Sequence, residues 1–221
     1  MEIIKKQIAY NTTKRTTAIK YIVIHDTGNK SKGADAIAHF NYFNGGDRNS
    51  SADFFVDDAN IIQVNDYKKF CTWQCGDGKG KYGITNQNSI GIEICVNEDG
   101  NYKEAFLNAV ELTKWLMKEL NIPAERVVRH YDASRKNCPA SMSSNDWAYW
   151  QDFKNRLSGN SATQDIKELT TPNDIVWELG HRGVVSDTKG MLDEMNQNPD
   201  GRLYWLARKM LHYIRTKEGG M

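Results

Sequence analysis

Three residues of the sequence are of types that bind transition metals, and two of them close short apolar runs. His25 ends the run YIVIH and His130 ends VVRH. Cys138 lies eight residues after His130 and is followed by Pro139. Histidine nitrogen and cysteine sulfur are common zinc ligands, and catalytic zinc sites combine three protein ligands with one open position for water. The three residues are therefore a candidate zinc centre, provided that the fold brings them together.

Each candidate ligand also has an ordinary structural interpretation. A histidine at the end of a strand is more often a hydrogen-bonded core residue, and a buried cysteine commonly packs as a small hydrophobic residue. The remaining histidines, which lie in an expected helix and near the C-terminus, are expected to be structural or surface residues: His39, His181 and His212. The metal hypothesis thus requires that the strands ending at His25 and His130 are neighbours in one sheet.

Two charged residues extend the candidate site toward hydrolysis. Glu93 lies in the apolar run SIGIEIC, where burial of a carboxylate is costly and raises its pKa toward the range of a general base. A salt bridge to Lys20 or Arg129 is the alternative interpretation. Lys136, two residues before Cys138, could stabilise the oxyanion that forms when a carbonyl is attacked, or could be an ordinary surface lysine.

The elements that must position these residues alternate between strands and helices. Apolar runs of strand character lie at 20–28, at 52–65 as a hairpin, at 89–97 and at 126–130. Helical periodicity is found at 32–44, 102–120 and 147–157. This alternation predicts an α/β fold in which helices cover a buried sheet, and such sheets build their sites on loops at the carboxyl ends of strands.

The composition of the chain changes near residue 158. Residues 1–157 are expected to form one domain, the polar and small residues of 158–172 a linker, and 173–221 a helical domain. Helix-start signals in the last part include Ser186 and Asn198-Pro199. We therefore predict a small C-terminal three-helix bundle, whose helices must share one apolar centre because so short a segment has little core.

Charge, hydropathy and cysteine usage exclude several classes of protein. The net charge of +1 gives no electrostatic footprint for nucleic acid. No apolar run is long enough for a membrane span, and the N-terminus lacks the apolar core of a secretory signal, so synthesis in the cytoplasm without a signal peptide is expected. The four cysteines are then expected to be reduced thiols, and the Cys71–Cys75 pair is a weak zinc signal because no second pair lies nearby.

Four segments taken together resemble a known enzyme family. They are IVIHDTG, SSADFFVDDANIIQV, TWQCGDGKGKYGITNQNSIGIEICVN and VVRHYDASRKNCP. Over about residues 21–150 the chain resembles the zinc-dependent N-acetylmuramoyl-L-alanine amidases of the type-2 amidase and peptidoglycan-recognition-protein group. It looks most like the endolysins of phages and prophages of Gram-positive spore formers. The resemblance implies a central mixed β-sheet flanked by helices, one Zn²⁺ ion, and hydrolysis of the amide between N-acetylmuramic acid and L-alanine, which lyses bacterial cell walls.

The resemblance also implies roles for individual residues by their position. Three zinc ligands are implied: His25, His130 and Cys138. Glu93 would be the catalytic base, and Lys136 would stabilise the oxyanion. The candidate substrate-binding residues come from the loops around this group and are Thr27, Trp73 and Gly76. Of these, Trp73 is a candidate platform for a sugar or a peptide.

The sequence departs from the family pattern in two elements. The element S-x-H-[YF] reads SADFF here, with Asp53 in place of histidine and Ala52 where some relatives have a catalytic tyrosine. The element W-H-x-G reads WQCG, with Gln74 in place of histidine. Both changes are expected near the substrate groove, where they would affect substrate recognition rather than the metal.

The sequence also allows alternative functions and indicates which partners the protein would bind. A chromosomal autolysin of the same chemistry, or a cell-wall peptidase with Cys138 as nucleophile, remain alternatives to an endolysin. The expected partners are bacterial peptidoglycan and, through the C-terminal helices, a secondary wall polymer, although those helices could instead be a packing extension of the first domain. The protein would act at the cell wall after release, which for an endolysin depends on a holin.

Overall fold

The computed structural model describes residues 2–158 and, in the C-terminal part, residues 175–176, 179–180, 184–198, 203, 206–207 and 210. The chain divides into two compact units, Met1–Asn160 and Ser161–Met221. Within the part of the chain so described, no helix has both the length and the apolar character needed to cross a membrane.

The first unit is built on a six-stranded mixed sheet with the strand order β1-β5-β4-β7-β3-β8. Its strands are β1 (Ile4–Lys5), β3 (Tyr21–Asp26), β4 (Phe54–Val56), β5 (Ile61–Gln63), β7 (Ser89–Ile94) and β8 (Val127–Arg129). The expected hairpin is the antiparallel pair β4–β5, and the other neighbours run parallel. Two further strands, β2 (Thr12–Lys14) and β6 (Phe70–Thr72), form a separate antiparallel pair.

Three helices of this unit correspond to those that the periodicity predicts, although α1 begins four residues later and α4 three residues earlier than expected, and the short α3 was not expected. They are α1 (Ala36–Asn44), α2 (Tyr102–Leu120), α3 (His130–Ser134) and α4 (Ser144–Leu157), with single 3₁₀ turns at Gly76–Gly78, Asn86–Asn88, Ala124–Arg126 and Ala140–Met142. The second helix has the bounds that its pattern predicts, because Asn101 accepts a hydrogen bond at its start and Asn121 adopts a left-handed conformation at its end. The first helix begins later than expected because the Asp35 side chain caps it by accepting from Ala38 N.

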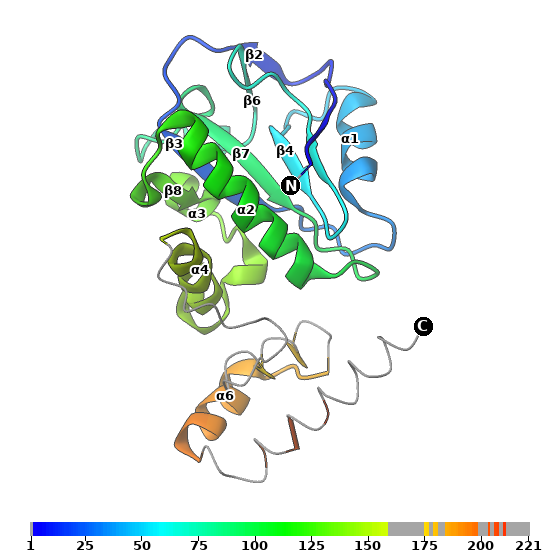
Figure 1. Ribbon diagram of the computed structural model, residues 1–221, viewed down its shortest axis with the longest axis vertical. Helices are drawn as coiled ribbons and strands as arrows, with labels where there is room; N and C mark the ends of the chain where they lie inside the picture. The colour runs from blue at the N-terminus through cyan, green and yellow to red at the C-terminus, as the bar shows by residue number, and fades with distance from the viewer. Residues whose placement is uncertain are drawn as a thin grey trace. The chain divides into compact units, whose positions relative to one another are not determined.

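The two faces of the sheet carry different residues because side chains alternate along a strand. Figure 1 shows α2 running across the sheet, where it packs on β7 and β4. Phe54 and Phe55 are adjacent in β4 and therefore point to opposite faces. Phe55 stacks with His39 and Phe43 of α1, so the α1 side of the sheet is the side of Phe55. Phe55 pairs with Glu93 of β7, and Glu93 pairs with His25 of β3. Residues paired in this way point to the same face, so His25 and Glu93 lie on the side of Phe55.

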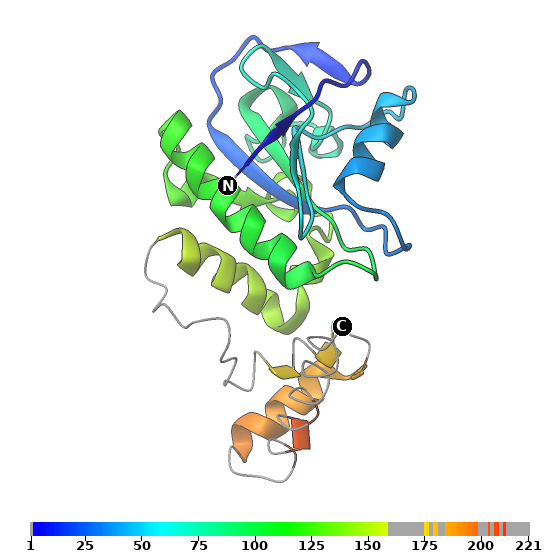
Figure 2. The same ribbon diagram turned by 45° about the vertical axis from the view of Figure 1, so that its right-hand side comes forward.

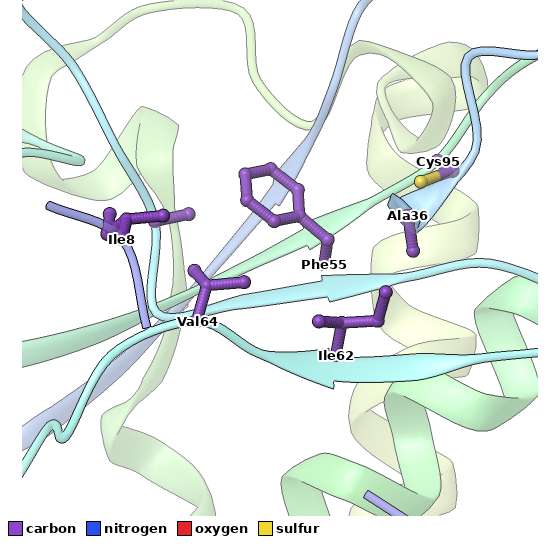
Figure 3. Close-up of a cluster of buried hydrophobic side chains, with 7 residues drawn as sticks. Ile8, Ala36, Phe55, Ile62, Val64 and Cys95 are labelled. Carbon is purple, nitrogen blue, oxygen red and sulfur yellow. The ribbon is translucent and has the colours of Figure 1, made fainter. Parts of the chain in front are cut away.

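A buried apolar cluster fixes the α1 side of the sheet. Figure 3 shows Phe55 of β4 beside residues from β5, α1 and the flanking segments: Ile8, Ala36, Ile62, Val64 and Cys95. Full burial of a side chain the size of Phe55 or Ile62 contributes about 1.5–3 kcal/mol. The N-terminal strand β1, visible in Figure 2, is the edge strand next to β5. Ile8 follows β1 in the chain, so the cluster holds distant parts of the chain together.

The second unit contains the helix α6 (Thr188–Gln197). Asp187, not the expected Ser186, is its N-cap, and the Asp187 side chain accepts from Gly190 N. The buried residues come from three parts of this unit: Ile175, Val176, Leu179, Leu192, Met195 and Ala207. They form one apolar cluster, and the three-helix bundle itself stays a prediction. Residues 159–172 of the expected linker, and much of the first and third expected helices, lie outside the described residues.

Candidate metal centre

The three predicted ligands come together at the carboxyl ends of two neighbouring parallel strands. Ile24 of β3 pairs with Arg129 of β8, so His25 and His130, the next residues of each chain segment, lie side by side. Their Nδ1 atoms are 3.1 Å apart, and Cys138 Sγ lies 3.8 Å from His25 Nδ1. The three ligand atoms all lie within 4.8 Å of one another. The side chains are nearly inaccessible, with His25 1%, His130 4% and Cys138 5% exposed.

Local hydrogen bonds bring Cys138 back to the two histidines. Tyr131 N, in the first turn of α3, donates to the Cys138 carbonyl over 3.0 Å. On the other side, the carboxylate of Asp26 in β3 accepts from Ser141 N over 2.7 Å. The loop that carries the cysteine is therefore attached both to the helix that begins at His130 and to the strand that carries His25.

The hydrogen bonds of the outer ring nitrogens show which atoms face the centre. His25 Nε2 lies 2.7 Å from Gln74 Oε1, and His130 Nε2 lies 2.8 Å from Asp77 Oδ1. Both partner atoms are acceptors, so each Nε2 carries a hydrogen and each Nδ1 presents a lone pair. Two lone pairs at such a distance repel each other unless a cation lies between them.

Two of the three distances between ligand atoms are close to those that a zinc ion sets, and the third pair, His130 Nδ1 and Cys138 Sγ, lies within 4.8 Å. With bonds of about 2.0–2.1 Å to nitrogen and about 2.3 Å to sulfur, tetrahedral geometry places two nitrogens about 3.3 Å apart and nitrogen and sulfur about 3.6 Å apart. The structure has 3.1 Å and 3.8 Å for these two distances. Two imidazoles and a thiol are also a donor set that zinc favours.

Burial sets the protonation of the ligand side chains. It lowers the pKa of His25, with His130 adding to the effect, and it lowers the pKa of His130 as well, so neutral imidazoles are favoured. Burial, and then the charge of Glu93, raises the pKa of the Cys138 thiol. A cysteine nucleophile needs the opposite shift. The raised pKa therefore disfavours the cysteine-peptidase alternative. A metal ligand also needs the thiolate, which a bound cation would stabilise.

Glu93 lies beside the ligands and has the properties of a proton acceptor. It pairs with His25 in the sheet register, and its Oε1 lies 3.9 Å from His25 Nδ1. Burial, followed by the charge of Asp26, raises the pKa of Glu93 to about 8, against the opposing charge of Lys136. Its side chain is 21% exposed, so one edge remains accessible to a substrate.

The expected alternative for Glu93, a salt bridge to Lys20 or Arg129, is absent among the residues that the structure describes. Arg129 instead pairs with Asp132 over 2.7 Å. Glu93 Oε2 is buried and has no hydrogen-bond partner in the described part of the protein. A buried carboxylate oxygen left without a partner is costly.

Lys136 and the candidate substrate-binding residues lie around this group. Lys136 is exposed, and its carbonyl accepts from Cys138 N. Thr27 follows β3, and its hydroxyl is buried without a partner among the described residues. The Trp73 indole donates to Thr13 Oγ1 over 2.9 Å, and Gly76 begins an exposed 3₁₀ turn. Their roles toward a substrate stay predictions.

Asp53, one of the departures from the family pattern, lies in the interior directly before β4. It is fully buried and accepts hydrogen bonds from Gly91 N, Thr72 Oγ1 and Asn65 Nδ2. Burial raises its pKa although these hydrogen bonds act against the shift. Asp53 therefore ties β4 to β6 and β7, and its expected effect on substrate recognition stays a prediction. Ala52 is buried beside it.

Gln74, the other departure, contacts a candidate metal ligand. The expectation that this change concerns only the substrate is therefore wrong, since Gln74 accepts from His25. Its role, and that of Asp77, was missed because both residues come from a glycine-rich loop far from the histidines in sequence. The WQCG departure itself was the only sequence signal that pointed to Gln74.

The fold and the site define an α/β protein with a centre of two histidines and one cysteine at the carboxyl end of its sheet. A family model described as N-acetylmuramoyl-L-alanine amidase matches residues 15–141. The chain therefore belongs to the N-acetylmuramoyl-L-alanine amidase family.

Individual relatives agree with this family. The chain is 41% identical over 153 residues to the N-acetylmuramoyl-L-alanine amidase CwlH of Bacillus subtilis strain 168, covering 69% of this chain and 57% of CwlH. It is 37% identical over 195 residues to the amidase XlyA of the same organism, covering 86% of this chain and 60% of XlyA. A solved structure described as a mutant endolysin from Bacillus subtilis is 40% identical with a TM-score of 0.64, covering 71% of this chain and 98% of that one. The chain thus spans somewhat more than half the length of these two curated relatives.

Proposed function

We propose that this protein is a peptidoglycan hydrolase that cleaves the amide bond between N-acetylmuramic acid and L-alanine of the stem peptide. The observation that carries the proposal is the convergence of His25, His130 and Cys138 beside the buried carboxylate of Glu93. Membership of the amidase family supports this choice of bond.

The three converging residues would hold one Zn²⁺ ion through the two Nδ1 atoms and Sγ. When bound, the ion would supply Lewis-acid chemistry, polarising a carbonyl and lowering the pKa of water. The facing lone pairs of the histidines and the matching ligand distances support this assignment.

Glu93 would take the proton from the attacking water and later deliver it to the departing amine of L-alanine. A general acid–base residue works best with a pKa near the working pH, and burial places the pKa of Glu93 at about 8. Lys136 would stabilise the negative charge that develops on the carbonyl oxygen. Support for this role comes from its position two residues before Cys138 and from its charge acting on Glu93.

Mass analysis of digested peptidoglycan tests the proposal. Purified cell walls incubated with the protein should release stem peptides with new free L-alanine amino groups, and no new reducing ends should appear. New reducing ends would indicate a glycosidase, and new amino groups on other stem residues would indicate a peptidase; either result contradicts the proposal. A chelator should abolish the activity and zinc should restore it, whereas a thiol enzyme would respond to alkylation instead.

The biological setting belongs to the same proposal. We place the protein among endolysins that act on the wall after holin-dependent release, with a chromosomal autolysin as the alternative. The C-terminal unit would bind a secondary wall polymer. The similarity to a solved endolysin catalytic fold supports the first part, and the separate apolar cluster of the second unit supports an independent role for it.

A further inference from the structure

We propose that the segment from Gln74 to Asp77 is a positioning element that fixes the tautomer of both histidine ligands. The inference rests on the metal site of the proposed function. The segment follows β6 and supplies the partner of each outer ring nitrogen, Gln74 for His25 and Asp77 for His130. Such partners orient ligating imidazoles and commonly change metal affinity by about 10- to 100-fold.

The orientation of the Gln74 amide is determined by a relay of hydrogen bonds. Ser89 Oγ donates its single hydrogen to the Thr85 carbonyl over 2.5 Å. The same oxygen must therefore accept from Gln74 Nε2, which lies 2.6 Å away. The amide oxygen of Gln74 is then left to face His25 Nε2 at 2.7 Å. An acceptor at this place forces the hydrogen of His25 onto Nε2 and leaves Nδ1 free for a metal.

Two further contacts hold Gln74 in place. Asn86 Oδ1 accepts from the backbone N–H groups of both Gln74 and Cys75, over 3.1 Å and 2.8 Å. Gly91 in β7 leaves the space that the glutamine side chain occupies, because a Cβ on Gly91 would lie only 2.9 Å from Gln74 Cγ. The buried glutamine is thus fixed through its backbone, its aliphatic chain and its amide.

Asp77 performs the matching role for His130 through a different contact. Its carboxylate can only accept, so it holds the hydrogen of His130 on Nε2 over 2.8 Å. The next residue, Gly78, sits directly on α3: a Cβ on Gly78 would lie 2.1 Å from the Ala133 carbonyl oxygen. Because of this close approach, the 3₁₀ turn Gly76–Gly78 packs directly against α3, the helix that begins at His130.

The test measures the His25 tautomer by nitrogen-15 NMR of the metal-free protein, and zinc affinity by competition with a chromophoric chelator. Gln74→Met keeps the side-chain size but removes the acceptor. We expect His25 to shift away from the Nε2–H tautomer, and zinc affinity to fall about 10- to 100-fold. Gln74→Glu keeps an acceptor and should retain the wild-type tautomer. Gln63→Met, the same change at a partly buried glutamine bonded to Asn65 O, is the matched control and should alter neither readout.

Each outcome decides the inference. An unchanged tautomer and zinc affinity in Gln74→Met would overturn it. If the residue only filled space, Gln74→Met would be the milder change and Gln74→Glu the more disruptive one, which is the reverse of our expectation and would also overturn it. Because the tautomer is read without metal or substrate, failure of the amidase assignment would leave this result interpretable.

Discussion

Glu93 of β7 pairs with His25 of β3 in the sheet, and its Oε1 lies near the His25 ring. Its other oxygen, Oε2, has no hydrogen-bond partner in the described structure. A carboxylate in this state is stabilised in its neutral form by burial, and it gains from a bound molecule that supplies the missing contact. This combination suits a residue that exchanges a proton with a substrate or with water.

Replacing Glu93 by glutamine should separate catalysis from metal binding. The amide keeps the shape but cannot accept a proton, so we expect turnover to fall about 10²- to 10⁴-fold. The bound zinc content should stay that of the wild-type protein, because His25, His130 and Cys138 are unchanged. Kinetics on purified peptidoglycan together with elemental analysis check both parts. Near wild-type turnover would remove Glu93 from the proposed mechanism.

The same variant provides a test of the raised pKa in metal-free protein. The pKa of Glu93 rises from 4.5 to about 8 on folding, so the folded state binds this proton more tightly than the unfolded chain. The resulting stability is present at low pH and is lost as the pH rises through this range. The free energy of unfolding of the wild type, relative to Glu93→Gln, should fall by about 3–4 kcal/mol between about pH 5 and pH 8. Urea unfolding at each pH measures both free energies. A difference between wild type and Glu93→Gln that stays constant over this range would show that burial does not shift the pKa of Glu93.

Individual residues differ in how far the sequence alone could assign them. His25 and His130 are recognisable because each ends a short apolar run, and neighbouring strands bring such positions together. Gln74 lies 49 residues from His25, and Asp77 lies 53 residues from His130. No local pattern links residues at these separations, so their contacts become visible only when the loop is placed on the sheet.

Among the helices and strands, those with a periodic or continuous apolar pattern are predictable, including the three-residue strands β4, β5 and β8. Short elements without such a pattern are not. The nineteen residues of α2 repeat an apolar pattern over several turns, and capping residues mark both ends. The strands β1, β2 and β6 have only two or three residues each, too few to show alternation. The short helix α3 starts immediately after β8, so its first residue, His130, looked like the end of the strand.

Gly78 connects two of these elements and should not tolerate a side chain. In Gly78→Ala the new Cβ would meet the backbone oxygen of Ala133 at 2.1 Å, so the turn must move away from α3. We expect a loss of about 1–3 kcal/mol in the free energy of unfolding and weaker zinc binding through the displaced Asp77. Gly76→Ala is the control for stability, because its Cβ would meet only the end of the Asn86 side chain at 3.2 Å. Equal stability of the two variants would contradict the close approach.

The whole molecule combines the amidase fold with a second compact unit. The family match ends at residue 141, and the second unit begins at Ser161 with an apolar cluster of its own. A module that carries its own core can act separately from the catalytic unit, which is the basis for proposing that it binds the wall.

Removal of the second unit should therefore weaken attachment to walls more than it weakens the chemistry. The full chain carrying Glu93→Gln, fused to a fluorescent protein, should decorate susceptible walls. The same fusion ending at Asn160 should decorate them at least about tenfold less, since a tethered second site raises effective concentration. The active form ending at Asn160 should still cleave soluble peptidoglycan fragments. Equal decoration by both fusions would assign the second unit to packing rather than binding.

The proposed chemistry depends on a single zinc ion bound by His25, His130 and Cys138. X-ray absorption at the zinc edge of the purified active protein measures this directly. We expect one zinc per chain, with two nitrogen neighbours at about 2.0–2.1 Å and one sulfur neighbour at about 2.3 Å. In Cys138→Ser we expect the sulfur signal to be lost. An active protein without stoichiometric zinc, or a zinc environment without sulfur, would contradict it.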